Sequence, residues 1–513
     1  MVIEWLRNSR KWIVVILLGL FLAGCYRPGP GARPFQVSSS DSDPHYFAVK
    51  ATETPGQFPT AGLGQISAPS PTPNQPIALP EPRTESVEYI VQQGDTLRKI
   101  AQDHQVSIDQ IVMANEIPDP NLIDVGQVLL IPPPNLEQVT PAFKIIPDSE
   151  LVYSPSNANF DVEGFITNYN GFLMTYSEEV DGVVLSGAEI VQRVALENSV
   201  NPRLLLAFLE YQSRWLTDRT PDEISQYYPM RYFDSYVTGL YRQLGWSANL
   251  LNEGYYGWKD EKISVWLLSD HSVIQVAPTI NPGTAGVLNL LRHFAAYSDW
   301  EQKTSEAGFF SVYYGLFGYP FDFAHEPMIP EGLTQPELQL PIESGDAWSF
   351  TGGPHGGWNS GSAWAAVDFA PPGDPRGCYP SDAWVVASAP GEVVYSDHGA
   401  VIQDLEGDGV WQSGWSILYM HIDTRNRVPV GTYLNTGDKV GHPSCEGGFS
   451  SGTHLHFARR YNGEWIAANG NIPLVMDGWK AVSTGVEYNG LLIKGDQTLE
   501  AYNGRSPLNA INR

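Results

Sequence analysis

Hydrophobic and polar positions follow different periods in different parts of the chain. The first ordered pattern is expected over residues 86–133, where short apolar runs flank two stretches with helical spacing. Asp95 is expected to be the N-cap of the first of these helices, and Ser107 and Gln110 have the spacing of a capping box for the second. The four runs are EYIV, GDTLRKIAQDH, SIDQIVMANE and VGQVLLIP. This order predicts a small βααβ module.

Residues 145–335 carry the helical period almost throughout. Ser186 is expected to be the N-cap of one helix, with Glu189 three residues later. Asn201 is expected to be the N-cap of the next helix, with Pro202 at its first helical position. The apolar-rich runs are SGAEIVQRVALENS, NPRLLLAFLEYQSRWL and TAGVLNLLRHFAAYS. We therefore expect a mostly α-helical middle domain.

Residues 345–480 change to short β-type runs with many Gly, Val, Tyr and Trp, which predicts a C-terminal antiparallel β domain. Residues 481–513 are expected to form a C-terminal tail. The chain as a whole is thus predicted to be a multidomain α+β protein.

The run SGTHLHF places two histidines one residue apart. In a strand, alternate side chains point to the same face, so His454 and His456 would lie side by side, with Leu455 and Phe457 on the opposite face. Two imidazoles on one face suit a metal site, although two polar residues on the wet face of an ordinary strand give the same pattern.

The N-terminus has the features of an export signal. A positive stretch with Arg7, Arg10 and Lys11 precedes the apolar run IVVILLGLF, which ends in LAGC at Cys25. LAGC resembles the lipobox of bacterial lipoproteins. This resemblance implies that residues 1–25 are a signal peptide, and that a lipidated Cys25 holds the protein on a membrane, outside the cytoplasm and facing the cell wall. An uncleaved membrane anchor is the alternative.

Composition narrows the possible partners. The formal net charge is −27, and no long basic run follows the N-terminus, so no nucleic-acid binding is expected. Residues 26–85 are rich in Pro, Ser, Thr and Gly and are expected to form a disordered spacer. Outside the cytoplasm, Cys378 and Cys445 could form a disulfide; two separate buried thiols are the alternative.

The runs YIVQQGDTLRKIA, IVMANEI and VGQVLLIPP resemble a LysM domain over its whole length. The resemblance implies binding to glycans such as peptidoglycan, in a groove between two loops. Asp95 and Leu97 also have structural interpretations, as a helix cap and a core residue. The implied groove residues are Gly94, Asp95, Thr96 and Leu97 on one side and Asn115, Glu116 and Ile117 on the other.

The run VNPRLLLAFLEYQSRW weakly resembles the entry helix of lysozyme-like lytic transglycosylases, in which a glutamate donates the catalytic proton. Gln212 stands at that position, and the nearest carboxylate, Glu210, comes two residues earlier. The middle domain is therefore expected to be either a lysozyme-like domain without catalysis or a generic helical spacer.

The C-terminal domain contains the residues that hydrolysis of a peptide bond needs. Zinc with three protein ligands and an open position activates water and polarises a carbonyl, and further imidazoles move protons. One aspartate and four histidines supply this set at strand or loop positions: His355, Asp368, His421, His454 and His456.

HGGWNSGSAWAAVDF, LYMHI and CEGGFSSGTHLHFARRYNGEW resemble the lysostaphin-type metallopeptidases. The long gap between the first histidine and the aspartate, with the CEGG stretch, resembles the β-lytic and staphylolysin branch. The resemblance implies Zn²⁺ as cofactor, with His355, Asp368 and His456 as ligands. It also implies that His454 is the general base and that His421 stabilises the oxyanion.

Together these features predict a membrane-anchored zinc endopeptidase that cleaves peptide cross-bridges of peptidoglycan and is targeted by its LysM module. A catalytically silent regulator or activator of other wall hydrolases is the alternative, and a glycan-binding wall anchor is a third. Retention of the whole ligand set favours the enzyme. DLEGDGVW partly resembles a calcium loop, but a polar hairpin turn is expected there, because Trp415 occupies the twelfth position.

Overall fold

The structure is a computed structural model that describes residues 71–79, 83–134, 139–345, 347–373 and 377–513. Cys25, the expected signal peptide and most of the expected spacer lie outside these residues. Within the described ranges, no helix combines the length and the apolar character needed to cross a bilayer.

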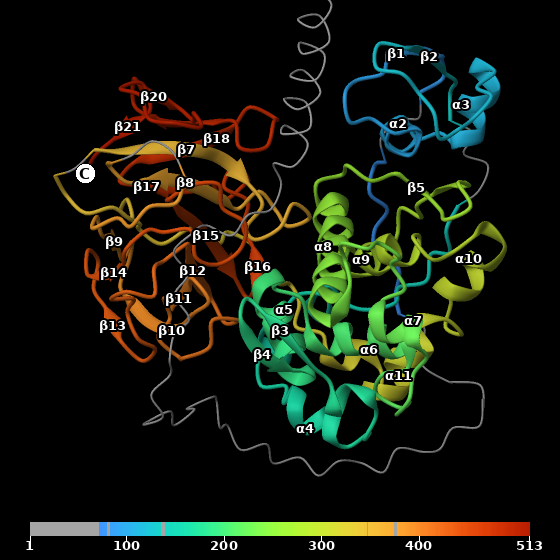
Figure 1. The fold of residues 1–513 in the computed structure, drawn as a ribbon, viewed down its shortest axis with the longest axis horizontal. Helices are drawn as coiled ribbons and strands as arrows, with labels where there is room; N and C mark the ends of the chain where they lie inside the picture. Colours follow the sequence, from blue (N-terminus) through green and yellow to red (C-terminus); the bar gives the residue numbers. More distant parts are fainter. Residues whose placement is uncertain (1–70, 80–82, 135–138, 346, 374–376) are drawn as a thin grey trace, which may run out of the picture. The chain divides into compact units, whose positions relative to one another are not determined.

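The N-terminal module has the expected βααβ order (Figure 1). Strands β1 and β2 pair antiparallel, and apolar side chains of both helices pack beneath them. Leu267 of the middle domain also belongs to this small core. The elements are β1 (Val87–Ile90), α2 (Leu97–Asp103), α3 (Ile108–Asn115) and β2 (Val128–Ile131).

One of the two predicted caps in this module is confirmed and the other is wrong. Ser107 and Gln110 form the capping box of α3. The N-cap of α2 is Thr96 rather than Asp95. The Asp95 carboxylate instead accepts hydrogen bonds from the Tyr89 hydroxyl (2.7 Å) and the Gln92 N–H (2.8 Å), so it ties the turn back to β1.

The middle domain is mostly helical, as predicted. Ser186 and Glu189 form a capping box on α5, and Asn201 caps α6 with Pro202 in its first turn. Four short 3-10 turns connect the longer elements: η1 (Asp148–Glu150), η2 (Pro155–Asn157), η3 (Phe172–Thr175) and η4 (Pro320–Phe323). The helices and two small hairpins are α4 (Val162–Thr167), β3 (Ser177–Val180), β4 (Val183–Ser186), α5 (Gly187–Asn198), α6 (Pro202–Ser213), α7 (Glu223–Tyr227), α8 (Gly239–Lys259), β5 (Val265–Leu267), β6 (Val273–Gln275), α9 (Pro282–Leu291), α10 (Tyr297–Thr304) and α11 (Phe309–Phe317).

The C-terminal domain is built on a nine-stranded antiparallel sheet in the order β13-β10-β11-β12-β15-β8-β7-β21, with β16 paired to β15. Figure 1 shows β7, β8 and β15 within this sheet. The strands are β7 (Trp348–His355), β8 (Ala366–Ala370), β9 (Val385–Val386), β10 (Gly391–Asp397), β11 (Ala400–Asp404), β12 (Trp415–Met420), β13 (Tyr433–Leu434), β14 (Lys439–Gly441), β15 (Leu455–Tyr461), β16 (Glu464–Trp465), β17 (Val475–Met476), β18 (Trp479–Ser483), β19 (Gly490–Lys494), β20 (Gln497–Glu500) and β21 (Ala510–Ile511).

Residues 481–513 were expected to form a tail, but in the structure they contribute β-strands. Strands β18, β19 and β20 continue a four-stranded sheet that begins at β17. Strand β21 pairs with β7, which ends at His355. Near the other end of β7, the Gly353 N–H donates to Tyr488 O at 2.7 Å, so the segment between β18 and β19 lies beside the strand that carries His355.

The two faces of the large sheet belong to different cores. Ile417 and Phe457 pack in a core formed by the C-terminal domain. Their neighbours along the strands, Leu418 and Ala458, belong to a core shared with the helices of the middle domain. Because successive strand residues point to opposite faces, one face of the sheet is continuous with the helical core.

Candidate metal centre

Three neighbouring strands bring the predicted ligands together. His355 is the last residue of β7, Asp368 lies in the middle of β8, and His456 is the second residue of β15. Asp368 is directly opposite His456 in the β8–β15 register. Cross-strand neighbours lie only about 5 Å apart, so residues distant in sequence become adjacent side chains.

The donor atoms of these residues form a tight triangle. His355 Nε2 lies 3.0 Å from His456 Nδ1, and each of these nitrogens lies 3.3 Å from Asp368 Oδ1. All three side chains are buried. Among the described residues, this is the one group of three or more His, Cys, Asp or Glu side chains close enough to hold a metal ion.

Backbone carbonyls fix which ring nitrogen carries hydrogen. His355 Nδ1 lies 2.8 Å from Gly353 O, and His456 Nε2 lies 2.9 Å from Gly357 O. A carbonyl oxygen only accepts, so these nitrogens must donate. In the neutral rings, the lone pairs of His355 Nε2 and His456 Nδ1 then face each other and the carboxylate.

This arrangement fits a cation. Asp368 Oδ1 is buried and has no hydrogen-bond partner, and a buried carboxylate oxygen is costly to leave without one. Ligands about 2.0–2.1 Å from a tetrahedral zinc lie about 3.3 Å from one another, which matches the observed spacing. Two imidazoles and one carboxylate are also ligands that zinc accepts.

Burial and charge shift the pKa values of this cluster. Burial works against the charged form of Asp368, but the His355 and His454 rings hold the pKa of its carboxyl well below the usual range. Burial lowers the pKa of His456. Burial also opposes a charge on His355, yet the Asp368 carboxylate raises the pKa of that ring.

The other two predicted histidines stand beside the triangle. His454 Nε2 lies 3.8 Å from Asp368 Oδ1, and the His421 and His454 ring centroids are 4.4 Å apart. Both rings have Nδ1 next to a carbonyl, Gly452 O at 2.7 Å for His454 and Glu446 O at 3.0 Å for His421. In their neutral forms, both therefore have a lone pair on Nε2.

The backbone at His421 is unusual. Its φ is +65°, in the left-handed region that non-glycine residues rarely adopt. Its carbonyl accepts hydrogen bonds from the Ser444 N–H (2.6 Å) and hydroxyl (3.1 Å). Such strain persists where surrounding contacts enforce it, and it is common in functional sites.

The alternation predicted for SGTHLHF is confirmed. His454 and His456 line one cavity of about 620 Å³, which also contains His355, Asp368 and His421. Leu455 and Phe457 are fully buried in the core on the other side. All five predicted chemical residues thus share one open pocket.

The sequence did not reveal several residues of this pocket, which come from the segment expected to be a tail. Glu487, Tyr488 and Arg505 line the cavity. The Tyr488 ring stacks on His355 with centroids 4.2 Å apart. No local motif marks Tyr488, because its role depends on a tertiary contact across more than a hundred residues.

A disulfide joins Cys378 and Cys445 in the structure. Next to it, Gly377 and Gly452 form a bridge, and the Thr453 N–H donates to Gly377 O. The disulfide thus fastens the segment that leads directly into His454.

The predicted LysM groove residues divide into exposed and structural ones. Gly94 has a φ of +89° with open space around it, so its loop is accessible. Leu97 and Ile117 are buried in the module core. Asn115 donates to Leu130 O and accepts from Leu130 N, both at 2.7 Å, and so joins α3 to β2. Thr96 caps α2, and Glu116 ends α3 in a left-handed conformation.

Other candidate carboxylates accept hydrogen bonds from nearby backbone N–H groups. The Glu210 carboxylate accepts from the Leu216 N–H (3.0 Å) and the Thr217 N–H (3.2 Å), as a local cap. In the loop resembling a calcium site, Asp404 accepts from the Gly409 N–H (2.9 Å), and Asp408 accepts from the Val410 N–H (2.9 Å). These contacts are those of a polar turn, as predicted.

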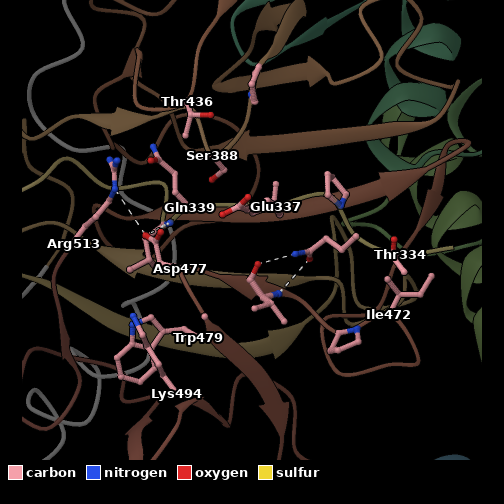
Figure 2. Close-up of a pocket in the computed structure, with 18 of the residues that line it drawn as sticks. Thr334, Glu337, Gln339, Ser388, Thr436, Ile472, Asp477, Trp479, Lys494 and Arg513 are labelled. Carbon is pink, nitrogen blue, oxygen red and sulfur yellow. Dashed lines mark hydrogen bonds and ion pairs between the residues drawn. The ribbon is translucent and has the colours of Figure 1, made fainter.

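A second hollow, of about 1190 Å³, lies elsewhere on the C-terminal domain (Figure 2). Its lining contains no histidine or cysteine. Asp477 accepts from the Leu340 N–H (2.9 Å) and lies 3.9 Å from the Arg513 guanidinium. Asp477 thus pairs with Arg513, and without histidines in its lining this hollow lacks the converging ring lone pairs of the other cavity.

Three segments match known family profiles. Residues 89–132 match the LysM domain, residues 144–329 match the N-terminal domain of LasA, and residues 373–468 match peptidase family M23. The chain thus combines a LysM region with an M23 peptidase region. His355 and Asp368 precede the stretch that matches the peptidase profile, and the fold brings them to His456.

Curated relatives match different shares of the chain. Protease LasA of Pseudomonas aeruginosa is 27% identical over 297 residues, which cover 53% of this chain and 65% of that protein. The chain thus spans less than two thirds of the length of this relative. Beta-lytic metalloendopeptidase of Lysobacter enzymogenes is 29% identical over 167 residues, 31% of this chain and 85% of that protein. N-acetylmuramoyl-L-alanine amidase XlyA of Bacillus subtilis is 44% identical over 63 residues, 12% of this chain and 21% of that protein.

Proposed function

We propose that the protein is a zinc endopeptidase that hydrolyses peptide cross-bridges of peptidoglycan. The observation that carries the proposal is the triangle of His355 Nε2, Asp368 Oδ1 and His456 Nδ1, with sides of 3.0–3.3 Å, in an open cavity beside two further histidines. Similarity to proteins named as a protease and as a metalloendopeptidase supports the same reaction class.

The three donors would hold zinc, which supplies Lewis-acid chemistry by polarising the scissile carbonyl and making water more acidic. His454 has its Nε2 lone pair 3.8 Å from the ligand Asp368, which suits a general base for the attacking water. The proton it takes can then pass to the leaving amine.

His421 also has an Nε2 lone pair, because its Nδ1–H is directed to Glu446 O. A neutral His421 would therefore accept a proton or a substrate N–H rather than donate to an oxyanion. The Tyr488 hydroxyl is the better donor for that purpose. Its ring stacks on a ligand, and burial raises its pKa to about 12, so it keeps its hydrogen at neutral pH.

The LysM module would hold the enzyme on its substrate. Residues 89–132 match the LysM domain, and the chain is also similar to an N-acetylmuramoyl-L-alanine amidase, which supports a wall glycan as the ligand. The exposed loop at Gly94 would contribute to this groove, with Asp95, Thr96 and Asn115 maintaining its shape. Tethering raises the effective concentration of the enzyme at the wall, so weak glycan binding suffices.

Lipidation of Cys25 would place the enzyme outside the cytoplasm, on the membrane facing the wall. This part of the proposal rests on the LAGC sequence and the preceding apolar run. Acylation at Cys25 would appear as a mass increase on the N-terminal peptide, and Cys25→Ser would release the protein from the membrane fraction.

The test of the reaction is digestion of purified peptidoglycan by the full chain, followed by mass spectrometry of the products. New amino and carboxyl termini within the cross-bridge are expected from the unmodified chain and not from His456→Ala. His398→Ala is the matched control, since His398 lies outside the cavity lining. Zinc binding without new termini would contradict the proposed reaction and favour a regulator of other wall hydrolases.

A further inference from the structure

Two helices of the middle domain contact the loop that follows the first metal ligand. Asn359 Nδ2 donates to Asn198 Oδ1 on α5 at 2.7 Å, and the Gly361 N–H donates to Asn249 Oδ1 on α8 at 2.8 Å. A Cβ at position 361 would lie 2.1 Å from Asn249 O, so the backbones touch at this point. These contacts join segments more than a hundred residues apart.

The loop connects this contact to a second histidine ligand, His456. Ser362 Oγ donates to Asn359 O at 2.6 Å, and the Gly357 N–H donates to Ala363 O at 3.1 Å, which closes the loop on itself. Gly357 O accepts the Nε2–H of His456. The position of the loop therefore sets the orientation of the His456 ring.

The same helices hold the end of the hairpin that carries His456. Trp465 Nε1 donates to Asn198 O at 3.3 Å, and the Trp465 ring packs where a Gly357 Cβ would lie. Beside it, Glu464 accepts from the Tyr255 hydroxyl at 3.1 Å and pairs with Lys259. Asn198 thus contacts both the loop after His355 and the hairpin of His456.

The middle domain does not line the cavity itself. All residues that line the histidine cavity lie between Thr351 and Arg505, in the C-terminal domain. Within the described residues, the helices therefore support the back of the metal site and leave its entrance open.

We propose that the helical middle domain positions the metal site, with Asn198 and Asn249 as positioning residues acting through the loop Gly356–Trp364. This inference rests on the proposed zinc site. The middle domain then orients the loop that directs the His456 ring, and loss of its contacts with that loop would weaken metal binding.

The experiment is a double-mutant cycle on zinc affinity in the full chain. Asn198→Ala, Asn359→Ala and the double variant compete for zinc with a chromogenic chelator. Changes to the groups that orient metal ligands typically weaken metal binding 10- to 100-fold, so we expect each single variant, which acts through the loop, to lose about tenfold. The double variant should lose no more than the larger single loss, because both changes remove one contact.

Asn289→Ala is the matched control. Asn289 is a buried asparagine of α9 that donates to Leu250 O at 2.8 Å and accepts from Arg292 Nε at 2.8 Å, and neither partner belongs to the loop. Its loss should lower thermal stability without changing zinc affinity. Equal losses in Asn289→Ala, or additive losses in the cycle, would overturn the inference and indicate general destabilisation.

Two further outcomes separate this inference from the proposed function. If Asn198→Ala does not fold, Asn359→Ala tests the contact by itself, because Asn359 is exposed. Zinc bound equally well by the parent and by Asn359→Ala would overturn the inference and leave the peptidase proposal intact. A parent chain that binds no zinc would contradict the proposed function.

Discussion

At the scale of single residues, the arrangement of lone pairs in the cluster calls for a positive charge. His355 Nε2 and His456 Nδ1 lie 3.0 Å apart beside a carboxylate oxygen without a hydrogen-bond partner. A second proton on one ring would relieve the repulsion, and a metal ion would relieve it for all three donors at once. Backbone carbonyls accept the Nδ1–H of His355 and the Nε2–H of His456, so the other nitrogen of each ring is oriented to bind a metal ion.

Tyr488→Phe tests whether the phenol hydroxyl acts in the reaction. Phenylalanine keeps the ring that stacks on His355 but removes the O–H. We expect kcat on peptidoglycan fragments to fall about 100- to 1000-fold, because a donor to the developing oxyanion is lost, with zinc content unchanged. Tyr502→Phe, outside the cavity lining, serves as the control, and an unchanged kcat in Tyr488→Phe would rule out this role.

His293 gives a prediction on pH. Burial, with the positive charges of Arg292 and Arg98, lowers the pKa of His293 to about 3. Between pH 6.5 and 3, the unfolded chain binds a proton at this position that the folded chain excludes. The stability contributed by neutral His293 is therefore complete above pH 6.5 and is lost as the pH falls toward 3.

Denaturant unfolding at pH 7 and pH 5 measures this effect. His293→Phe keeps an aromatic ring next to Trp246 and cannot titrate. The loss of unfolding free energy between the two pH values should be smaller in the variant, by about 1–2 kcal/mol. Identical losses in both proteins would show that His293 does not contribute.

At the scale of elements, the chemistry depends on how strands are fastened. The Cys378–Cys445 disulfide closes a span of 67 residues and fixes the segment that leads into His454. Replacing both cysteines by serine should lower the unfolding free energy by about 2–4 kcal/mol, because the unfolded chain gains freedom. Urea unfolding without reductant measures the change, and an unaltered midpoint would contradict this view.

Local signals explain which elements could be predicted from the sequence. The caps at Ser107, Ser186 and Asn201 depend on residues within one turn, and the structure confirms all three. Asp95 failed as a cap because the Tyr89 hydroxyl and the Gln92 N–H bind its carboxylate, which leaves Thr96 to cap α2. This competition for the Asp95 carboxylate comes from a neighbouring strand and turn, which the rules for helix caps do not consider.

The residues of the candidate site also fall into those that could be predicted from the sequence and those that could not. The five polar residues could be found from their types and spacing, since strand alternation places His454 and His456 on one face. Tyr488 and Asn198 could not be found, because each reaches the site through packing between distant segments. The residues that hold and orient the ligands are thus the hardest to predict from a single sequence.

At the scale of the whole molecule, the middle and C-terminal domains share a core. Leu418, Ala458 and Trp465 of the sheet belong to the same buried cluster as Leu205 and Leu209 of α6. We expect the two domains to unfold in one calorimetric transition. A metal that binds only the folded form stabilises it, so under the proposed function saturating zinc should raise, and a chelator lower, the temperature of that joint transition. Two separate transitions, with zinc shifting only one, would show that the domains are energetically independent.

The proposed metal site is tested most directly by the rate at which new amines appear in purified peptidoglycan as zinc is added back to the metal-stripped full chain. We expect no activity in the stripped protein, a rise that reaches its plateau at about one zinc per chain, and no rise in Asp368→Asn. Full activity in the stripped protein, or an equal plateau in Asp368→Asn, would contradict a peptidase built on His355, Asp368 and His456.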